Sequence, residues 1–167
     1  WADEFKKYPQ EHQVNLTKYN KEIGYYQFVQ YIFFNQWFKL KKYANDKGIK
    51  IIGDMPFYVD HGSVEVWLDN KSFLLDGIGY PTSVAGVPPD YFSPTGQYWG
   101  NPIYDWQYLE KNDFRFWIER IGWASEIFDI PRIDHFRPFD SYWDIPACAK
   151  TAMEGKWQYA PGYALFD

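Results

Sequence analysis

The stretch Ile130-Pro131-Arg132-Ile133-Asp134-His135-Phe136-Arg137-Pro138-Phe139 decides the fold of this chain. It opens with a short apolar run and then places an arginine, an aspartate and a second arginine close together. Side chains alternate between the faces of a strand, so a strand over residues 130–134 projects Arg132 and Asp134 to the same side. A neighbouring cation favours the ionised form of a carboxylate, which suits a nucleophile or a charge stabiliser. A structural ion pair at a strand end is the alternative interpretation.

Two amphipathic helices and a second strand surround this stretch. Apolar residues recur at spacings of three and four over residues 22–46 and again over residues 113–128, where Asp113 is the expected N-cap. The β-branched run over residues 49–54 predicts a strand, and the proline that follows predicts Asp54 at its carboxyl end. The expected apolar stripes are Tyr25, Phe28, Val29, Ile32, Phe33, Trp37, Leu40 and Ala44 in the first helix, and Phe114, Trp117, Ile118, Ile121, Ala124, Ser125 and Phe128 in the second.

The order helix, strand, long loop, helix, strand predicts an α/β fold with βα repeats, as in a parallel sheet or barrel. Parallel neighbours bring Asp54 and Asp134 to one rim, where α/β barrels carry their active sites. Pro131 is awkward inside a parallel strand, so the paired portion is expected to begin at Arg132. Residues 70–106 lack a sustained period but are rich in glycine, proline and aromatics, which predicts an ordered flap over a binding cleft.

The composition of the 167 residues narrows the ligand class. Aromatic residues make up 23% of the chain, more than a core filled mainly by Leu, Ile and Val requires, which predicts exposed stacking surfaces for sugars or bases. The net charge is −5 and no basic run occurs, which argues against a nucleic-acid partner. No apolar run reaches the ~20 residues of a membrane span. A neutral ligand such as a sugar fits best.

The chain ends and its cysteine predict its context. It begins at Trp1 without methionine and stops just after Tyr163-Ala164-Leu165-Phe166, which predicts that residues 1–167 were excised from a longer protein. Cys148 is the only cysteine, so no internal disulfide can form, and it is expected to be a small buried hydrophobe. A reducing, cytoplasmic location is expected.

Several kinds of catalytic site are poorly supported. The histidines His12, His61 and His135 lack the spacing and the cysteine partners of a metal site, so no metal and no cofactor is expected. There is neither a G-x-S-x-G nucleophile elbow nor a phosphate-binding glycine loop. Carboxylate chemistry in an aromatic cleft remains, as in retaining glycoside transfer, where one ionised carboxylate attacks and a protonated one assists the leaving oxygen. Asp134 suits the first role. The second stays open among Asp54, Asp140 and Asp144.

Three segments of the chain closely resemble the amylomaltase family, the 4-α-glucanotransferases of glycoside hydrolase family 77. They are Gly53-Asp54-Met55-Pro56-Phe57-Tyr58-Val59, the segment from Ala85 to Ser93 that continues through Gly96-Gln97 and Trp99-Gly100-Asn101-Pro102, and Arg132-Ile133-Asp134-His135-Phe136-Arg137. The likeness extends from about Tyr25 to Phe166, with the three motifs in the family's order.

This resemblance implies a (β/α)8 TIM barrel, of which residues 1–167 would be a partial catalytic domain with about the third and fourth strands and long inserted loops. It implies transfer of α-1,4-glucan segments between maltooligosaccharides, starch or glycogen-derived glucans by retaining double displacement. Asp134 would be the nucleophile and Arg132 would position and charge it. The remaining residues that the resemblance assigns to the glucan site are Asp54, Asp90, Tyr91, Phe92, Trp99, Asn101 and His135, with Asp54 serving mainly as structural support.

The sequence also departs from the family pattern. Pro138 stands where the family usually has glycine, and residues 59–63 read Val-Asp-His-Gly-Ser where the family usually continues Val-Ala-x-Asp-Ser. His61 is therefore not equated with the substrate-binding histidine of α-amylases. The family's acid/base glutamate and transition-state aspartate belong to later strands. Two alternatives stay open: an α-amylase-type hydrolase and a non-catalytic glucan-binding fragment.

Overall fold

The computed structural model describes residues 2–6 and 14–167, which form two compact units. The first unit comprises Trp1–Asp54 and Trp123–Arg132, and the second comprises Met55–Gly122 and Ile133–Asp167. In the part of the chain that the structure describes, no helix has the combination of length and apolar character needed to cross a membrane. His12 lies outside the described residues.

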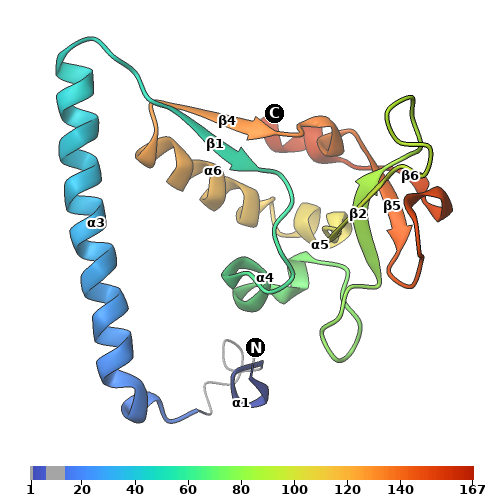
Figure 1. Ribbon diagram of the computed structural model, residues 1–167, viewed down its shortest axis with the longest axis horizontal. Coiled ribbons are helices and arrows are strands. Elements are labelled where there is room, and N and C mark those ends of the chain that lie inside the picture. The colour runs from blue at the N-terminus through green and yellow to red at the C-terminus, as the bar shows by residue number, and fades with distance from the viewer. Residues whose placement is uncertain (1, 7–13) are drawn as a thin grey trace. The chain divides into compact units, whose positions relative to one another are not determined.

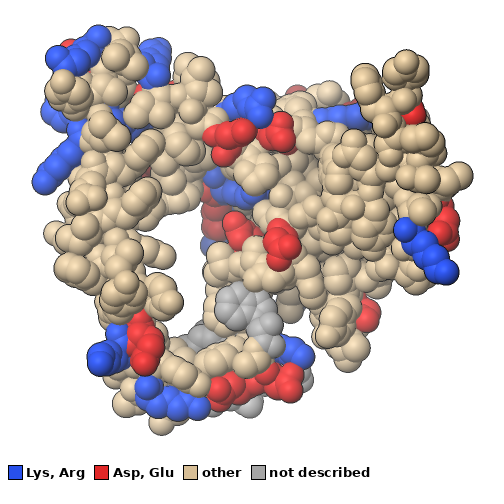
Figure 2. Space-filling view, in the orientation of Figure 1, with Lys and Arg blue, Asp and Glu red and all other residues tan. Residues whose placement is uncertain are grey.

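The first unit is dominated by the long helix α3 (Asn20–Asp46), preceded by the short helices α1 (Asp3–Lys6) and η1 (Leu16–Tyr19) (Figure 1). The helix predicted over residues 22–46 is thus confirmed. The helix ends at Asp46, and Gly48 just beyond it has a left-handed φ of 76°. The amide N–H groups of Gly48 and Ile49 donate to the carbonyls of Asn45 and Ala44, respectively. This is the Schellman arrangement that glycine favours. On the face shown in Figure 2, basic side chains gather over this end of the helix, although the last turn of α3 itself contains no basic residue.

The face of α3 that packs within the first unit is narrower than the predicted stripe. Phe34, Trp37, Lys41 and Ala44 are half-buried, and the ring centroid of Phe34 lies 5.4 Å from that of Trp123. Six residues of the predicted stripe are exposed instead, namely Tyr25, Phe28, Val29, Ile32, Phe33 and Leu40. No residue of α3, all of which the structure describes, is buried. The periodicity therefore identified the helix, but only part of its apolar face is covered within the described residues.

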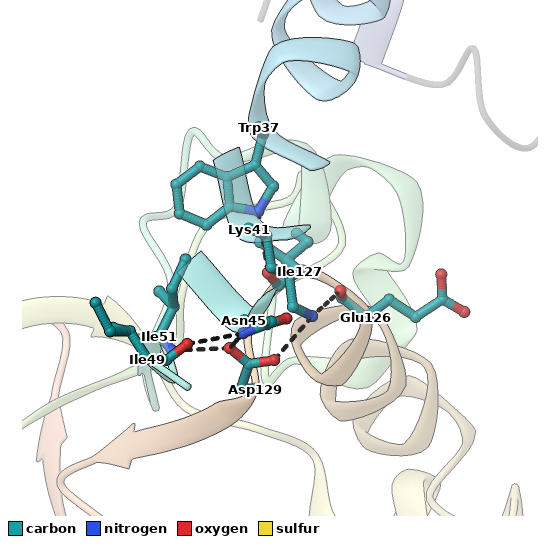
Figure 3. A network of polar contacts seen from close by, with 8 residues as sticks. All are labelled: Trp37, Lys41, Asn45, Ile49, Ile51, Glu126, Ile127 and Asp129. Atoms are coloured by element: carbon teal, nitrogen blue, oxygen red, sulfur yellow. Dashed lines mark hydrogen bonds and ion pairs between the residues drawn. The ribbon is translucent and has the colours of Figure 1, made fainter. Parts of the chain in front are cut away.

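Polar contacts with residues 126–129 hold the C-terminal half of α3 (Figure 3). The Trp37 indole N–H donates to the Ile127 carbonyl at 3.0 Å, and the Lys41 ammonium donates to the Glu126 carbonyl at 2.8 Å. One oxygen of Asp129 accepts from both the Asn45 amide and the Ile51 backbone N–H at 2.8 Å. These contacts lower the pKa of Asp129, chiefly through the Ile51 hydrogen bond.

The predicted strands form a two-stranded sheet of β1 (Ile52–Pro56) and β4 (Ile130–Asp134), whose arrows point the same way in Figure 1. Asp54 lies in the middle of β1 and not at its end, because the ladder starts later than predicted and continues through Pro56. Residue 51 is engaged by Asp129 instead. Likewise, β4 begins at Ile130 and includes Pro131, which was expected to precede the paired portion.

The second unit has an aromatic core. Phe57 lies with its ring centroid 4.8 Å from those of Trp117 and Phe139, and Tyr104 and Trp106 complete the buried cluster. Trp117 comes from α6 (Arg115–Ile127), which follows α5 (Trp106–Lys111), while α4 (Val64–Leu68) is capped by Ser63. The excess of aromatic residues was predicted to provide exposed stacking surfaces. Many aromatic residues, including Tyr91 and Phe92, are indeed exposed, while those named above fill this core.

An antiparallel sheet that the sequence analysis did not predict completes the second unit. Its strand order is β3-β2-β5-β6, formed by β2 (Ser83–Val87), β3 (Gln97–Pro102), β5 (Ser141–Pro146) and β6 (Lys156–Tyr159). The predicted flap over residues 70–106 therefore contains two paired strands. Short 3₁₀ segments add η2 (Asn70–Ser72), η3 (Arg137–Phe139), η4 (Ala152–Glu154) and η5 (Gly162–Phe166).

Two further predictions are wrong. Asp113 is not the N-cap of α6, because it lies in the turn after α5 with a left-handed φ of 52°, and the helix begins at Arg115. Cys148 is exposed and not buried, because it lies in the turn that follows β5 at the surface. The predicted stripe of α6 holds for Phe114, Trp117 and Ala124, which are buried, whereas Ile118 is exposed.

Candidate active site

In the second unit, the candidate site centres on the residues that end β4. Asp134 is the exposed last residue of the strand, and His135 follows with a left-handed φ of 56°, a conformation rare for residues other than glycine. The His135 ring lies edge-on to Trp99, with centroids 4.9 Å apart, and 6.3 Å from the Tyr58 ring. Strained backbone of this kind persists where surrounding contacts enforce it, and it is common at functional sites.

Burial sets the protonation state of His135. Loss of solvent lowers its pKa, while the neighbouring Asp134 acts in the opposite direction more weakly. The imidazole is therefore mainly neutral at pH 7, with one nitrogen as a donor and the other as an acceptor. A neutral ring of this kind can exchange hydrogen bonds with sugar hydroxyl groups beside Asp134.

Tyr58 packs against a group of residues that are linked by hydrogen bonds. Tyr58 stacks on Tyr104 at 6.2 Å, and the Tyr104 hydroxyl donates to the Phe57 carbonyl at 2.7 Å. The Arg120 guanidinium donates to the carbonyls of Pro56 at 2.7 Å and Phe57 at 3.1 Å. Burial raises the pKa of Tyr58 and of Tyr104, so both phenols stay protonated. Tyr58 lies in one of the three sequence motifs without a predicted role, and no local sequence signal points to Arg120.

Trp99 is oriented by a neighbour on its own strand. Its indole N–H donates to the Gln97 side-chain oxygen at 3.0 Å. Two positions on, the Asn101 amide donates to the Val59 carbonyl at 2.9 Å and ties β3 to the segment after β1. Thus Trp99 presents a partly exposed ring beside His135, while the Asn101 amide is engaged with the backbone.

The predicted loop residues lie at the tip between β2 and β3. Tyr91 is 95% exposed and Phe92 is 89% exposed, and their ring centroids lie 5.5 Å apart. Asp90 points its carboxylate at the backbone of the same tip and accepts from the amides of Phe92 and Ser93. Both aromatic rings are therefore exposed to solvent at a turn that is held by hydrogen bonds.

In the first unit, Arg132 of β4 pairs with Asp54 of β1. The two contacts are bidentate, with Nε 3.0 Å from Oδ1 and a terminal nitrogen 3.1 Å from Oδ2 of Asp54. Both side chains are more than half exposed, so the pair contributes little to stability by itself. It holds the guanidinium of Arg132, which precedes Asp134 by two positions on β4, against the Asp54 carboxylate.

The other carboxylates considered for proton transfer have different surroundings. Asp144 of β5 is buried, and one of its oxygens accepts from the Gln158 amide at 3.3 Å. Its charge adds to the burial that raises the pKa of Tyr142 to about 12. Asp140 is exposed and accepts from the Ser141 hydroxyl at 3.0 Å. The other oxygen of Asp144, Oδ1, is buried and has no hydrogen-bond partner among the described residues.

Metal ligation finds no support among residues 2–6 and 14–167, which contain no suitable cluster of His, Cys, Asp and Glu. His61 is engaged elsewhere, with its Nε2 2.7 Å from the Gly79 carbonyl oxygen. The described site thus offers a carboxylate, a neutral imidazole and aromatic rings, a set suited to sugars.

Comparisons with known proteins agree with this chemistry. The 4-alpha-glucanotransferase family, glycoside hydrolase family 77, matches residues 1–167. The chain is 55% identical to the 4-alpha-glucanotransferase of Thermus thermophilus over 147 residues, which cover 88% of this chain and 29% of that protein. It is 46% identical to the enzyme of the same name from Aquifex aeolicus, covering 99% of this chain and 34% of that protein.

Among solved structures, amylomaltase from Streptococcus agalactiae in complex with acarbose is similar with a TM-score of 0.89 and 48% identity. The match covers 99% of this chain and 34% of that one. The chain therefore spans about a third of the length of these relatives.

Proposed function

The chain belongs to the 4-alpha-glucanotransferase family, and from this premise we propose that its full-length protein transfers α-1,4-glucan segments between maltooligosaccharides or starch-type glucans. The observation that carries the proposal is the packing of Trp99 and Tyr58 on His135, directly beside Asp134. It joins the family's three sequence motifs around one exposed carboxylate. Stacking faces, a neutral imidazole and a carboxylate are what a glucan requires.

The proposed architecture follows from the same likeness. Residues 1–167 form part of a (β/α)8 barrel, with β1 and β4 as about its third and fourth strands. The pairing of these strands in the same direction supports this assignment. The antiparallel sheet β3-β2-β5-β6 is then an elaboration of the loops that follow the two barrel strands.

In the proposed mechanism, Asp134 attacks the anomeric carbon as the bond to the leaving glucan oxygen breaks. A second carboxyl group protonates that oxygen, and the family resemblance assigns it to strands beyond those matched here. The 4-hydroxyl of another glucan then attacks the glycosyl ester, gives up its proton to the same group and releases Asp134. Arg132, held by Asp54, precedes Asp134 by two positions on β4, and His135 bonds sugar hydroxyls.

The test is an Asp134→Asn variant of the full-length protein assayed with maltotriose. We expect loss of transfer on the order of 10⁴-fold or more, because the nucleophile is removed. Maltoheptaose binding, measured by calorimetry, should persist. Glu119→Gln is the matched control, since it removes an exposed carboxylate that pairs only with Arg115 on α6 in the described contacts. It should transfer normally.

Three outcomes would decide against parts of the proposal. Unchanged transfer by Asp134→Asn would exclude it as the nucleophile. Glucan binding without transfer by the wild-type protein would favour a non-catalytic binding role. Release of reducing ends in excess over longer maltooligosaccharides would favour an α-amylase-type hydrolase.

A further inference from the structure

The loop between β2 and β3 is closed at its base. Val87 and Gln97 pair across the two strands, and the intervening residues form the loop. Gly96 has a left-handed φ of 70°, and a Cβ atom there would lie 2.4 Å from the Val87 carbonyl oxygen. Only glycine allows so close an approach of the two backbones. Glycine is therefore required at the base of this loop.

The tip of the same loop is closed by Asp90. One carboxylate oxygen, Oδ1, accepts from the Phe92 amide at 2.9 Å and from the Ser93 amide at 2.8 Å. The Asp90 amide donates to the Ser93 carbonyl at 3.0 Å, and the Ser93 hydroxyl donates to the Gly96 carbonyl at 2.6 Å. An aspartate that bonds the amides two and three residues ahead defines an Asx turn.

This turn leaves Tyr91 and Phe92 almost completely exposed, with their rings nearly perpendicular at 89°. Their exposure adds nothing to the buried core of the second unit. Aromatic faces held in the open by an ordered turn lose little conformational freedom on binding, which favours affinity.

We infer that Asp90 is a positioning residue, which presets Tyr91 and Phe92 as stacking faces for a glucan through its hydrogen bonds to the loop backbone. The inference rests on the proposed function for the identity of the ligand. It differs from a direct contact between the Asp90 carboxylate and a sugar, because it assigns the effect of Asp90 to the hydrogen bonds that Oδ1 accepts from two loop amides.

The two roles respond differently to substitution. An asparagine oxygen can accept the same two amide hydrogen bonds and is favoured in Asx turns, whereas alanine cannot. A residue that acts through the turn is therefore rescued by asparagine. A residue that acts through its charge on the sugar is not.

The experiment compares Asp90→Ala and Asp90→Asn in the full-length Asp134→Asn protein, so that turnover does not consume the ligand. We expect Asp90→Ala to weaken maltoheptaose binding roughly 5- to 20-fold, the value of one to two backbone hydrogen bonds, with Asp90→Asn within about 3-fold of its parent. Hydrogen exchange of the Phe92 and Ser93 amides should accelerate in the alanine variant only.

Asp76→Ala is the matched control in the same background. Asp76 also closes an exposed turn in the second unit, where it accepts from the amides of Ile78 and Tyr80 at 2.9 Å and leaves Ile78 exposed. Its loss should accelerate exchange in its own turn without weakening maltoheptaose binding.

Equal weakening by the alanine and asparagine variants, with the amides still protected in the latter, would overturn the inference in favour of direct contact. Unchanged exchange in Asp90→Ala would overturn it as well. A protein with Asp134 intact that shows no transfer, while the binding and exchange pattern holds, would refute the proposed transferase and leave the role of Asp90 supported.

Discussion

The two units differ in what holds them together. In the first unit, α3 buries no residue, and polar contacts to residues 126–129 fix its C-terminal half. In the second unit, Phe57, Trp117 and Phe139 lie at the centre of a buried aromatic core. Among the residues proposed to contact glucan, His135 and Trp99 belong to the second unit, which has this buried aromatic core. A dense core suits them because it holds side chains in fixed positions.

The largest expected effect breaks the core of the second unit. Trp117 is completely buried against Phe57 and Phe139, so Trp117→Ala should lower the free energy of unfolding by roughly 3–5 kcal/mol. Trp123→Ala, on the same helix but 49% exposed, should cost about 1 kcal/mol. Denaturant unfolding of the full-length protein, followed by near-ultraviolet circular dichroism, measures both. Equal losses would mean that the aromatic core does not dominate stability.

A smaller effect should follow from breaking the polar contacts of the first unit. Asp129→Ala leaves the Ile51 amide and the Asn45 side chain without their shared acceptor, so the melting temperature should fall. Hydrogen exchange of the Ile51 amide should accelerate while Trp117 and its neighbours stay protected. Asp129→Asn retains an acceptor oxygen and should lose less. Equal loss of protection at Ile51 and around Trp117 would contradict a local role for Asp129.

The contribution of Asp129 to stability should depend on pH in a definite direction. The folded-state pKa of Asp129 is lowered, so its stabilisation is present above the unfolded value near 3.9 and is lost as pH falls through the folded value. The melting temperatures of the wild type and of Asp129→Ala should therefore differ most near neutral pH and converge in acid. A difference that grows as the pH falls would contradict this assignment.

The difference between local signals and contacts distant in sequence explains how much of the fold could be predicted. Periodicity identified α3 and α6, a β-branched run identified β1 and a short apolar run identified β4, because these signals depend on neighbouring residues. The sheet β3-β2-β5-β6 escaped because β2 carries Gly86 and β3 carries Gly100 and Pro102, which interrupt strand patterns locally. Its pairing of residues 83–87 with 141–146 depends on contacts distant in sequence.

For the site, the sequence motifs supplied Asp134, His135 and Trp99, and the structure brings the last two together. No sequence pattern could predict which hydrogen bonds each polar side chain forms. Asp90 and Asn101 were predicted as substrate contacts from the resemblance, and here their side chains bond backbone groups of the same unit. Arg120 of α6 donates hydrogen bonds to the carbonyls of residues 56 and 57, which lie far from it in the sequence, so no local pattern could predict this contact.

The smallest expected effects concern two glycines, one inside α3 and one just after it. Because α3 buries no residue, local backbone preferences should be visible in its stability. Gly48 has a left-handed φ of 76°, and a Cβ atom added there would meet no other atom within 4 Å, so Gly48→Ala adds strain without a clash. We expect a loss of about 1 kcal/mol. Gly24 lies inside the helix with equally open space, and Gly24→Ala should instead stabilise by about 0.5–1 kcal/mol, because alanine loses less entropy there. Thermal unfolding of the two variants should therefore shift in opposite directions. Shifts of the same sign would show that contacts outside the helix, and not its backbone, govern the stability of this unit.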